Sequence, residues 1–293
     1  MSSSSPRLLV TAASGQLGRL TVEALLRAVP AAQIVATARD PGRLADVAAK
    51  GVIVRAADYE KSDTLDAAFA GVDRVLLISS SAIGQRVPQH RNAIEAAKRA
   101  GVKLIAYTSV LHADKSTLGL AEEHRQTEAL LKASGVPFAL LRNGWYAENY
   151  AASIPSALQF NAVFGSAGNG KLSLAARGDY AEAAAAVLAS ADDQAGQVYE
   201  LAGDTAITLA DFAAELAKQT GKPITYQDMP EAAYKAALVG AGLPEGLATL
   251  LSDSDAQAAK GALFDDSGTL GKLIGHPTTP IAKVIAAALA ANA

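Results

Sequence analysis

A short apolar run that breaks into small residues and then takes up helical spacing constrains this chain most. Residues 8–10 are apolar and Thr11 ends the run, the next few side chains are small, and residues 16–28 have the spacing of a helix. Small side chains let the backbone approach phosphate groups, and the free amides and positive dipole end of the following helix stabilise negative charge. We expect a pyrophosphate-binding turn formed by Ala12, Ala13, Ser14, Gly15, Gln16 and Leu17.

Short apolar runs alternate with segments long enough for helices through the first half of the chain. The runs that we interpret as strands are residues 8–11, 33–38, 52–55, 74–79, 103–108 and 137–141. Such alternation is typical of a parallel sheet covered on both faces, in which ligands bind at the carboxyl ends of the strands. The sequence therefore predicts an α/β fold with a doubly wound parallel sheet.

The alternation weakens after Asn149, where we expect a smaller α+β C-terminal lobe to begin. Residues 167–170 indicate a turn, 179–189 a helix and 198–201 a strand that returns to the main sheet, and 208–219 a further helix. The predicted domains are residues 6–148 plus about 176–203, and about 149–175 plus 204–293. From Ile281 onward, apolar residues lie on one face of a last helix that is too short to cross a membrane.

Composition argues against several classes of function. The chain has 26 basic and 29 acidic residues, a net charge of −3 and no block of Lys or Arg for nucleic acid. It has no cysteine, and its four histidines lack the spacing of a zinc site. It has a polar start and no apolar run of about 18 residues. We expect a soluble cytoplasmic protein without a metal.

The end of the second predicted strand indicates which dinucleotide binds. At this place an arginine binds a 2′-phosphate, whereas a carboxylate binds the ribose 2′-hydroxyl. The sequence has Arg39 followed by Asp40, so we expect NADPH (or NADP⁺), with some use of NADH left open and a solvated strand end as the alternative. Ala12 stands where the first glycine of such turns is expected, and at a positive φ its methyl costs roughly 1 kcal/mol, about fivefold in affinity.

Other strand ends carry further candidates for the cofactor. Asp58 and Tyr59 follow the third strand and are expected to border the adenine, unless they are an ordinary polar strand end. Ser79, Ser80 and Ser81 follow the fourth strand, and their small side chains let the backbone pass beside the middle of the cofactor, although a plain loop explains them nearly as well. Arg177 reaches back to the cofactor or forms a structural salt bridge.

The acid that usually protonates an alkoxide in this kind of fold is missing. None of the eight tyrosines has a lysine four residues later. The expected helix carries His124 and Glu128 instead, one turn apart. We expect them to form a polar pair, with His124 as a donor or proton carrier near the cofactor, unless they are an exposed histidine and a solvated glutamate. Reduction of a quinone gives an oxygen with a pKa of roughly 10, for which a weak hydrogen bond is sufficient.

An aromatic segment follows the sixth strand. It contains the only tryptophan, and we expect it to form a flat, mostly apolar slot for a planar acceptor. Asn143 is expected to bind a carboxamide or substrate oxygen, and Gly144 lets the backbone approach. Trp145, Tyr146 or Tyr150 would wall the slot, with core packing as the alternative for Trp145. The predicted catalytic residues are His124, Asn143 and Tyr146.

Several segments together resemble the NmrA-like atypical short-chain dehydrogenases, close to bacterial NADPH-dependent quinone oxidoreductases and triphenylmethane dye reductases. They are the small-residue turn, Arg39 and residues 77–81, 107–109, 124–128, 141–146 and 273–277. The resemblance implies a Rossmann domain and a smaller C-terminal lobe, with NADP(H) and a quinone in the cleft between them. It assigns cofactor contacts to residues 12–17, Arg39, residues 79–81 and the loop from Asn143 to Glu148.

The leading hypothesis is NADPH-dependent reduction of a quinone by direct hydride transfer, without flavin or metal. Two alternatives remain open: reduction of another flat aromatic electrophile, such as a triphenylmethane dye, and a non-catalytic NmrA-like regulator that senses NADP(H). The expected partner is a small aromatic acceptor, with no nucleic acid, no membrane and a homodimer as the assembly.

Overall fold

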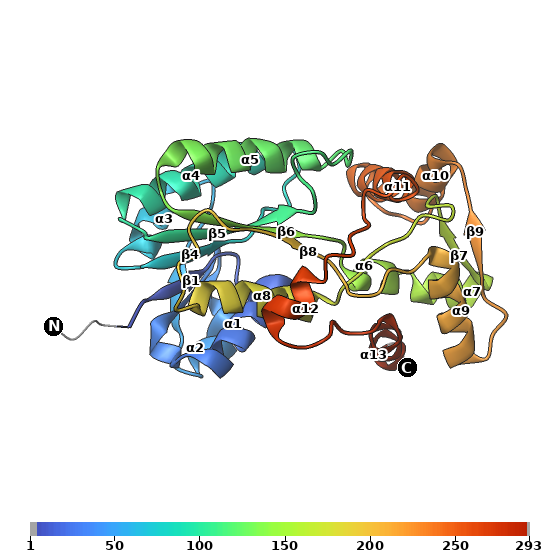
Figure 1. Cartoon of the computed structure of the whole chain (residues 1–293), viewed down its shortest axis with the longest axis horizontal. Helices are drawn as coiled ribbons and strands as arrows, with labels where there is room; N and C mark the ends of the chain where they lie inside the picture. Colours follow the sequence, from blue (N-terminus) through green and yellow to red (C-terminus); the bar gives the residue numbers. More distant parts are fainter. Residues whose placement is uncertain (1–4, 292–293) are drawn as a thin grey trace. The chain divides into compact units, whose positions relative to one another are not determined.

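The apolar runs of the first half assemble into one parallel sheet in the computed structural model, which describes residues 5–291 (Figure 1). The strand order is β3-β2-β1-β4-β5-β6-β8. Their bounds are Leu8–Val10 (β1), Ile34–Ala38 (β2), Ile53–Ala56 (β3), Arg74–Leu77 (β4), Leu104–Val110 (β5), Phe138–Asn143 (β6) and Val198–Leu201 (β8). All six predicted strands are present, with ends that differ by one to two residues, and the α/β fold class is confirmed. Strand β8 matches residues 198–201.

Helices cover both faces of this sheet. Figure 1 shows α3, α4 and α5 on one face and α1 and α8 on the other, where these last two pack together. The helices near the sheet are Gln16–Ala28 (α1), Ala45–Ala48 (α2), Ser62–Phe69 (α3), Arg86–Arg99 (α4), Ala121–Ser134 (α5) and Arg177–Ala189 (α8). The order of the strands reverses between β1 and β4, and in open α/β sheets ligands bind at this switch point.

The core under α3 and α4 explains why the strands have apolar runs rather than alternating patterns. Every residue of β1, β2 and β5 is buried, because parallel strands pack against helices on both faces. Leu9, Val75 and Ile105 point into a cluster with Phe69 and Ile94 from the helices. This packing holds the strand ends in place.

The chain forms two compact units. The first contains Met1–Ala113, Glu123–Asn143 and Arg177–Tyr199, and the second contains the rest. The start of the chain, expected to be polar, lies outside the described residues up to position 4.

The second unit has a small sheet and short helices. Strands β7 (Ala162–Gly165) and β9 (Thr225–Asp228) pair in parallel. Its helices are Ala147–Ala151 (α6), Ile154–Phe160 (α7), Leu209–Thr220 (α9), Glu231–Gly240 (α10), Glu245–Ala258 (α11), Thr269–Ile274 (α12) and Ile281–Ala291 (α13). Helix α9 begins with a capping box in which Thr208 and Asp211 bond each other's backbone N–H groups.

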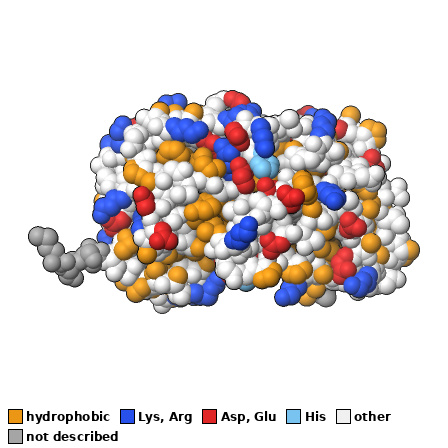
Figure 2. Space-filling model, viewed as in Figure 1, with side chains coloured by type: hydrophobic (Ala, Val, Ile, Leu, Met, Phe, Trp, Pro, Cys, Tyr) orange, Lys and Arg blue, Asp and Glu red, His pale blue; other side chains and the backbone are white. Residues whose placement is uncertain are grey.

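No helix within residues 5–291 is both long and apolar enough to span a membrane. On the face drawn in Figure 2, basic and acidic side chains lie interspersed with apolar ones.

Candidate cofactor site and the polar groups around it

The turn after β1 has the backbone that the sequence anticipates. Ala12 has φ +48°, in the left-handed region that favours glycine. The Ala13 N–H donates to the Thr37 carbonyl oxygen at 2.7 Å, and the Gly15 N–H donates to the Ala12 carbonyl oxygen at 2.9 Å. Because φ at Ala12 is positive, its methyl group costs free energy in this turn.

Helix α1 begins close against this turn. A Cβ added to Gly18 would lie 2.6 Å from the Ala12 carbonyl oxygen and 2.7 Å from the Ala13 Cα, so only glycine fits there without a shift. The cap residue is Gly15, no side chain caps the helix, and its first turn contains no acidic residue. The first amides of a 13-residue helix thus face no anionic side chain of their own, which fits a pyrophosphate.

Two neighbouring side chains at the end of β2 differ in what they bind. The Asp40 carboxylate accepts a hydrogen bond from the Gly42 N–H at 2.9 Å and caps the turn at Pro41–Leu44. The Arg39 side chain is exposed and has no hydrogen-bond or ion-pair partner among residues 5–291. The arginine is thus the group that is open to a ligand, which fits a 2′-phosphate better than a free ribose.

The Tyr59 hydroxyl links residues at the ends of β1, β3 and β4 by hydrogen bonds. Its hydroxyl lies 2.6 Å from the Thr11 Oγ1 and 2.7 Å from the Ile78 carbonyl oxygen, while the Thr11 hydroxyl donates to Leu76. Asp58 accepts from the Glu60 N–H at 3.1 Å. These bonds give both residues a structural role at the carboxyl ends of the strands. Their contact with adenine stays a prediction.

Side chains from neighbouring elements hold the serine segment after β4. The Ser79 N–H donates to the Thr108 Oγ1 at 2.8 Å, and the Ser80 N–H donates to the His90 Nε2 at 2.9 Å. The Arg86 Nε donates to the Ser80 carbonyl oxygen at 2.6 Å. Ser81, by contrast, is exposed. The backbone here is more constrained than in a plain loop.

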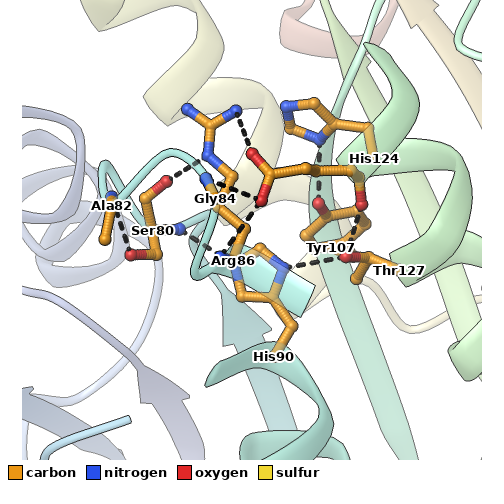
Figure 3. A network of polar contacts seen from close by, with 9 residues as sticks. Ser80, Ala82, Gly84, Arg86, His90, Tyr107, His124 and Thr127 are labelled. Atoms are coloured by element: carbon orange, nitrogen blue, oxygen red, sulfur yellow. Dashed lines mark hydrogen bonds and ion pairs between the residues drawn. The ribbon is translucent and has the colours of Figure 1, made fainter. Parts of the chain in front are cut away.

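His90 is a buried residue whose tautomer follows from its partners (Figure 3). Because Nε2 accepts from a backbone N–H, the ring proton is on Nδ1, which donates to the Thr127 hydroxyl at 2.9 Å. Burial, followed by the Arg86 charge, lowers the pKa of His90 to about 3. His90 therefore links the serine segment to helix α5 as a neutral ring.

His124 is paired with Tyr107 rather than exposed. Its Nδ1 lies 2.8 Å from the Tyr107 hydroxyl, and the histidine is only 4% exposed. Figure 3 marks this contact with a dashed line. Burial, followed by the Arg86 charge and the neighbouring His90 ring, lowers the pKa of His124 to about 3, while burial raises the pKa of Tyr107. The phenol is thus a donor, and when it donates to Nδ1 the histidine carries its proton on Nε2.

The suggested pairing of His124 with Glu128 is wrong. The Glu128 carboxylate accepts from the Ser109 hydroxyl at 2.6 Å and from Arg142 at 3.0 and 2.8 Å. The spacing of one turn was correct, but the strands under the helix offer each side chain a better partner. Glu128 is therefore part of a buried ion pair and not of a proton-transfer pair.

Asn143, at the end of β6, has an unused polar atom. It is 5% exposed, and its Oδ1 has no hydrogen-bond partner among the described residues. Its backbone oxygen accepts from the Leu111 N–H at 2.8 Å. A buried acceptor without a partner costs free energy, which fits a ligand donor at this position. Arg177 is the half-buried first residue of α8.

The remaining predicted site residues belong to the second unit. The Gly144 N–H donates to the Leu201 carbonyl oxygen at 2.7 Å, and the Trp145 carbonyl accepts from Ala175 at 3.3 Å. Trp145 is 9% exposed. Tyr146 caps helix α6, and Glu148 is in its first turn. Tyr150 is only 7% exposed and turns its hydroxyl toward Asp255, so this hydroxyl does not face a slot.

Sequence reasoning missed two residues of these networks, His90 and Asp255. His90 has Ala93, Ile94 and Ala97 three, four and seven residues later, all buried, so helical spacing alone would have placed it on the buried face of α4. Asp255 follows buried Ala248 and Ser252 at similar spacing on α11. Within the part of the chain that the structure describes, no three His, Cys, Asp or Glu side chains gather as metal ligands.

Comparison with known proteins shows to which family this chain belongs. The NmrA-like family model matches residues 4–274. Quinone oxidoreductase 2 of Escherichia coli (strain K12) is 57% identical over 278 residues, which cover 95% of this chain and 97% of that protein. The crystal structure of an NADPH-dependent quinone oxidoreductase from Escherichia coli complexed with NADPH matches with a TM-score of 0.94 and 56% identity, covering 96% of this chain and 99% of that chain.

A second solved structure is related at lower identity. Citrobacter sp. triphenylmethane reductase complexed with NADP(H) has a TM-score of 0.91 and 34% identity, covering 96% of this chain and 99% of that chain. The resemblance drawn from the sequence motifs is confirmed: this chain belongs to the NmrA-like family.

Proposed function

We propose that this protein is an NADPH-dependent quinone reductase that acts by direct hydride transfer, without flavin or metal. The observation that carries the reaction is the 57% identity, over 95% of the chain, to a protein named quinone oxidoreductase 2. When bound, NADPH supplies the hydride that reduces the quinone.

The residues that would hold the cofactor come mainly from the strand ends. Ala12 to Leu17 would surround the pyrophosphate, which the uncapped start of α1 supports. Arg39 would bind the 2′-phosphate, since Asp40 is already engaged by Gly42. Asp58 and Tyr59 would border the adenine, the backbone of residues 79–81 would follow the middle of the cofactor, and Arg177 would add a positive charge.

Three residues would act at the reacting end. Asn143 would bind the carboxamide or a quinone oxygen, and its unpartnered Oδ1 supports this role. His124 would offer a neutral Nε2–H, because its Nδ1 is bonded to Tyr107. Tyr146 would complete the site, together with Gly144, Trp145 and Glu148 of the same segment. A neutral Nε2–H would stabilise the developing oxyanion by a hydrogen bond, and water would supply the proton. This is sufficient because the oxygen of the reduced quinone is only as basic as a phenolate.

A second candidate acceptor and the broader context belong to the same proposal. A triphenylmethane dye is the second candidate acceptor, favoured by the match to a triphenylmethane reductase. The domain of residues 6–148 plus about 176–203 would bind the cofactor, and the domain of about 149–175 plus 204–293 would bind the acceptor. We further propose a homodimer, no binding of nucleic acid, which a net charge of −3 opposes, and a cytoplasmic location, where NADPH is regenerated.

The test is the loss of NADPH absorbance with and without benzoquinone. Acceptor-dependent consumption with one hydroquinone formed per NADPH supports the enzyme, whereas cofactor binding without turnover supports an NADP(H)-sensing regulator instead. Crystal violet in place of the quinone tests the dye alternative. Light scattering tests whether the protein is a homodimer. The electrophoretic mobility of a DNA duplex tests whether the protein binds nucleic acid.

A further inference from the structure

The second unit contains a buried carboxyl group that the proposed function does not use. Asp255 on helix α11 is 3% exposed. Its Oδ1 accepts from the Tyr150 hydroxyl at 2.6 Å, and its Oδ2 accepts from the Ser166 N–H at 3.0 Å. These bonds join α6, the end of β7 and α11, although Asp255 is 105 residues from Tyr150 in the chain.

No cation balances this carboxyl. Among the described residues, Asp255 has no ion-pair partner, and the titratable groups that face it are Tyr150 from α6, Tyr226 and Asp228 from β9, and Tyr234 from α10. The Tyr226 hydroxyl donates to Asp228 at 2.7 Å. Burial raises the pKa of Asp255 to about 6, while the bonds from Tyr150 and Ser166 act in the opposite direction.

The surrounding chain is shaped to this carboxyl. A Cβ added to Gly165 would lie 2.7 Å from the Asp255 Oδ2 and 2.8 Å from the Leu209 Cδ1, so the glycine gives the carboxylate its space. A buried acid without a cation costs stability, and perturbed groups of this kind gather at functional sites. The arrangement therefore points to a task other than stabilising the fold.

That task concerns helix α6, which follows the aromatic segment directly. The helix has only five residues, too few to hold its own geometry. Its start is bound to Ala175, which accepts from the Ala147 N–H at 2.9 Å and donates to the Trp145 carbonyl oxygen at 3.3 Å. Near its end, the Tyr150 side chain is bound to Asp255. Tyr146 and Tyr150 are four residues apart, so the bond to Asp255 restrains the rotation of the helix that Tyr146 caps.

We propose that Asp255 is a positioning residue that acts through the Tyr150 hydroxyl to orient α6, and with it Trp145 and Tyr146. The proposal rests on the proposed function for the role of Trp145 and Tyr146 beside the acceptor. The orientation itself concerns only the second unit. It can therefore be measured on the full chain without any substrate.

Trp145 is the only tryptophan, so fluorescence excited at a wavelength that tyrosine does not absorb reports on this segment. Both carboxyl oxygens of Asp255 accept hydrogen bonds, and protonation must weaken one of them. We expect the emission of the wild-type protein to change with a midpoint near pH 6. In Tyr150→Phe the midpoint moves to higher pH, because a bond that favours the carboxylate is lost. In Asp255→Asn the transition is absent.

Activity with NADPH and benzoquinone provides the second readout. We expect Asp255→Asn and Tyr150→Phe each to lower kcat/KM for benzoquinone about fivefold. The loss in the double variant should be no larger than the larger of the two single losses. Asp253→Asn is the matched control, since it lies on the same helix and accepts from the Gly119 N–H. Tyr199→Phe is the control for loss of a phenol, which there bonds Gln194. Both controls should keep the wild-type rate and midpoint.

The outcomes separate this proposal from the function on which it rests. A transition that persists in Asp255→Asn, a wild-type emission that is flat around pH 6, or additive losses in the double variant would overturn the positioning role. Absence of quinone reduction by the wild type, with the fluorescence pattern intact, would overturn only the function. If Asp255→Asn does not fold, the midpoint of Tyr150→Phe decides, because an unchanged midpoint contradicts the proposal.

Discussion

Arg142 and Glu128 form a two-point ion pair beneath helix α5. The Arg142 Nε and Nη2 donate to the two Glu128 carboxylate oxygens at 3.0 and 2.8 Å, and the two side chains are 8% and 4% exposed. The Ser109 hydroxyl donates to the same carboxylate at 2.6 Å. The pair joins α5 to the ends of β5 and β6, one residue before Asn143.

Removal of one partner from this pair should be strongly destabilising. Glu128→Ala removes the buried carboxylate that accepts two hydrogen bonds from Arg142 and one from Ser109, and we expect a loss of about 3–5 kcal/mol in the free energy of unfolding. The exposed pair between Arg99 and Asp66 is the control, and Asp66→Ala should cost less than about 1 kcal/mol. Urea denaturation measures both. Similar losses for the two variants would contradict the difference in burial.

Arg39→Ala should weaken NADPH much more than NADH. Only NADPH has the 2′-phosphate that this free guanidinium would bind, and a lost charged hydrogen bond is worth about 1.5–3 kcal/mol, roughly 10- to 100-fold in affinity. Calorimetric titration of both nucleotides measures the ratio. Arg99→Ala, another exposed arginine, should change neither affinity. An equal loss for NADPH and NADH would remove Arg39 from the phosphate site.

The turn after β1 should respond to changes at two positions in opposite directions. Ala12→Gly relieves the left-handed strain and should raise NADPH affinity, by at most about fivefold. Gly18→Ala places a methyl group against the turn and should cost about 1–3 kcal/mol of stability. Gly246→Ala, at an exposed position of α11, is the control for stability, because no atom lies within 4 Å of its added Cβ. Weaker NADPH binding by Ala12→Gly would argue against this reading of the turn.

His124 should matter little as an acid. Because the pKa of His124 is about 3, the ring is neutral at physiological pH and loses no proton as an imidazolium. We expect His124→Ala to lower quinone turnover by less than about tenfold, compared with ~10²–10⁴-fold for a general acid. Steady-state rates measured across pH should show the same ionisations in the wild type and in His124→Ala. A thousandfold loss would make His124 an essential acid.

The two buried histidines should make the protein sensitive to acid. Each has a pKa near 3 when folded against 6.5 when unfolded, so the unfolded chain binds more protons between these values. The free energy of unfolding should therefore fall as the pH drops from about 6.5 toward 3, by about 1.4 kcal/mol per pH unit for each histidine. Denaturation at several pH values gives the change of the free energy of unfolding with pH. In His124→Gln this change should be smaller than in the wild type by about 1.4 kcal/mol per pH unit. An unchanged slope would mean that His124 is charged in the folded protein.

The elements of the first half could be predicted from residues because their causes are local. Apolar runs of β-branched and aliphatic residues form buried strands, and the segment from Gln16 to Ala28 forms the helix expected after the turn. The left-handed conformation at Ala12 and the free side chain of Arg39 also agree with their places in the pattern. The family resemblance rested on the same short segments.

The polar networks could not be predicted in this way. His124 and Glu128 lie one turn apart on α5, which suggested a mutual contact, yet each bonds a side chain of a strand beneath the helix. Asp255 and Tyr150 are 105 residues apart and meet only after their helices pack.

The sequence by itself determined the α/β architecture, the small-residue turn after β1 and the arginine that follows β2, because each depends on residues within one strand, one turn or one helix. The tertiary structure decided which polar groups pair and which remain open to a ligand, such as the Oδ1 of Asn143. The physical reason is that burial makes every polar group need a partner, and that partner is supplied by whatever element packs against it.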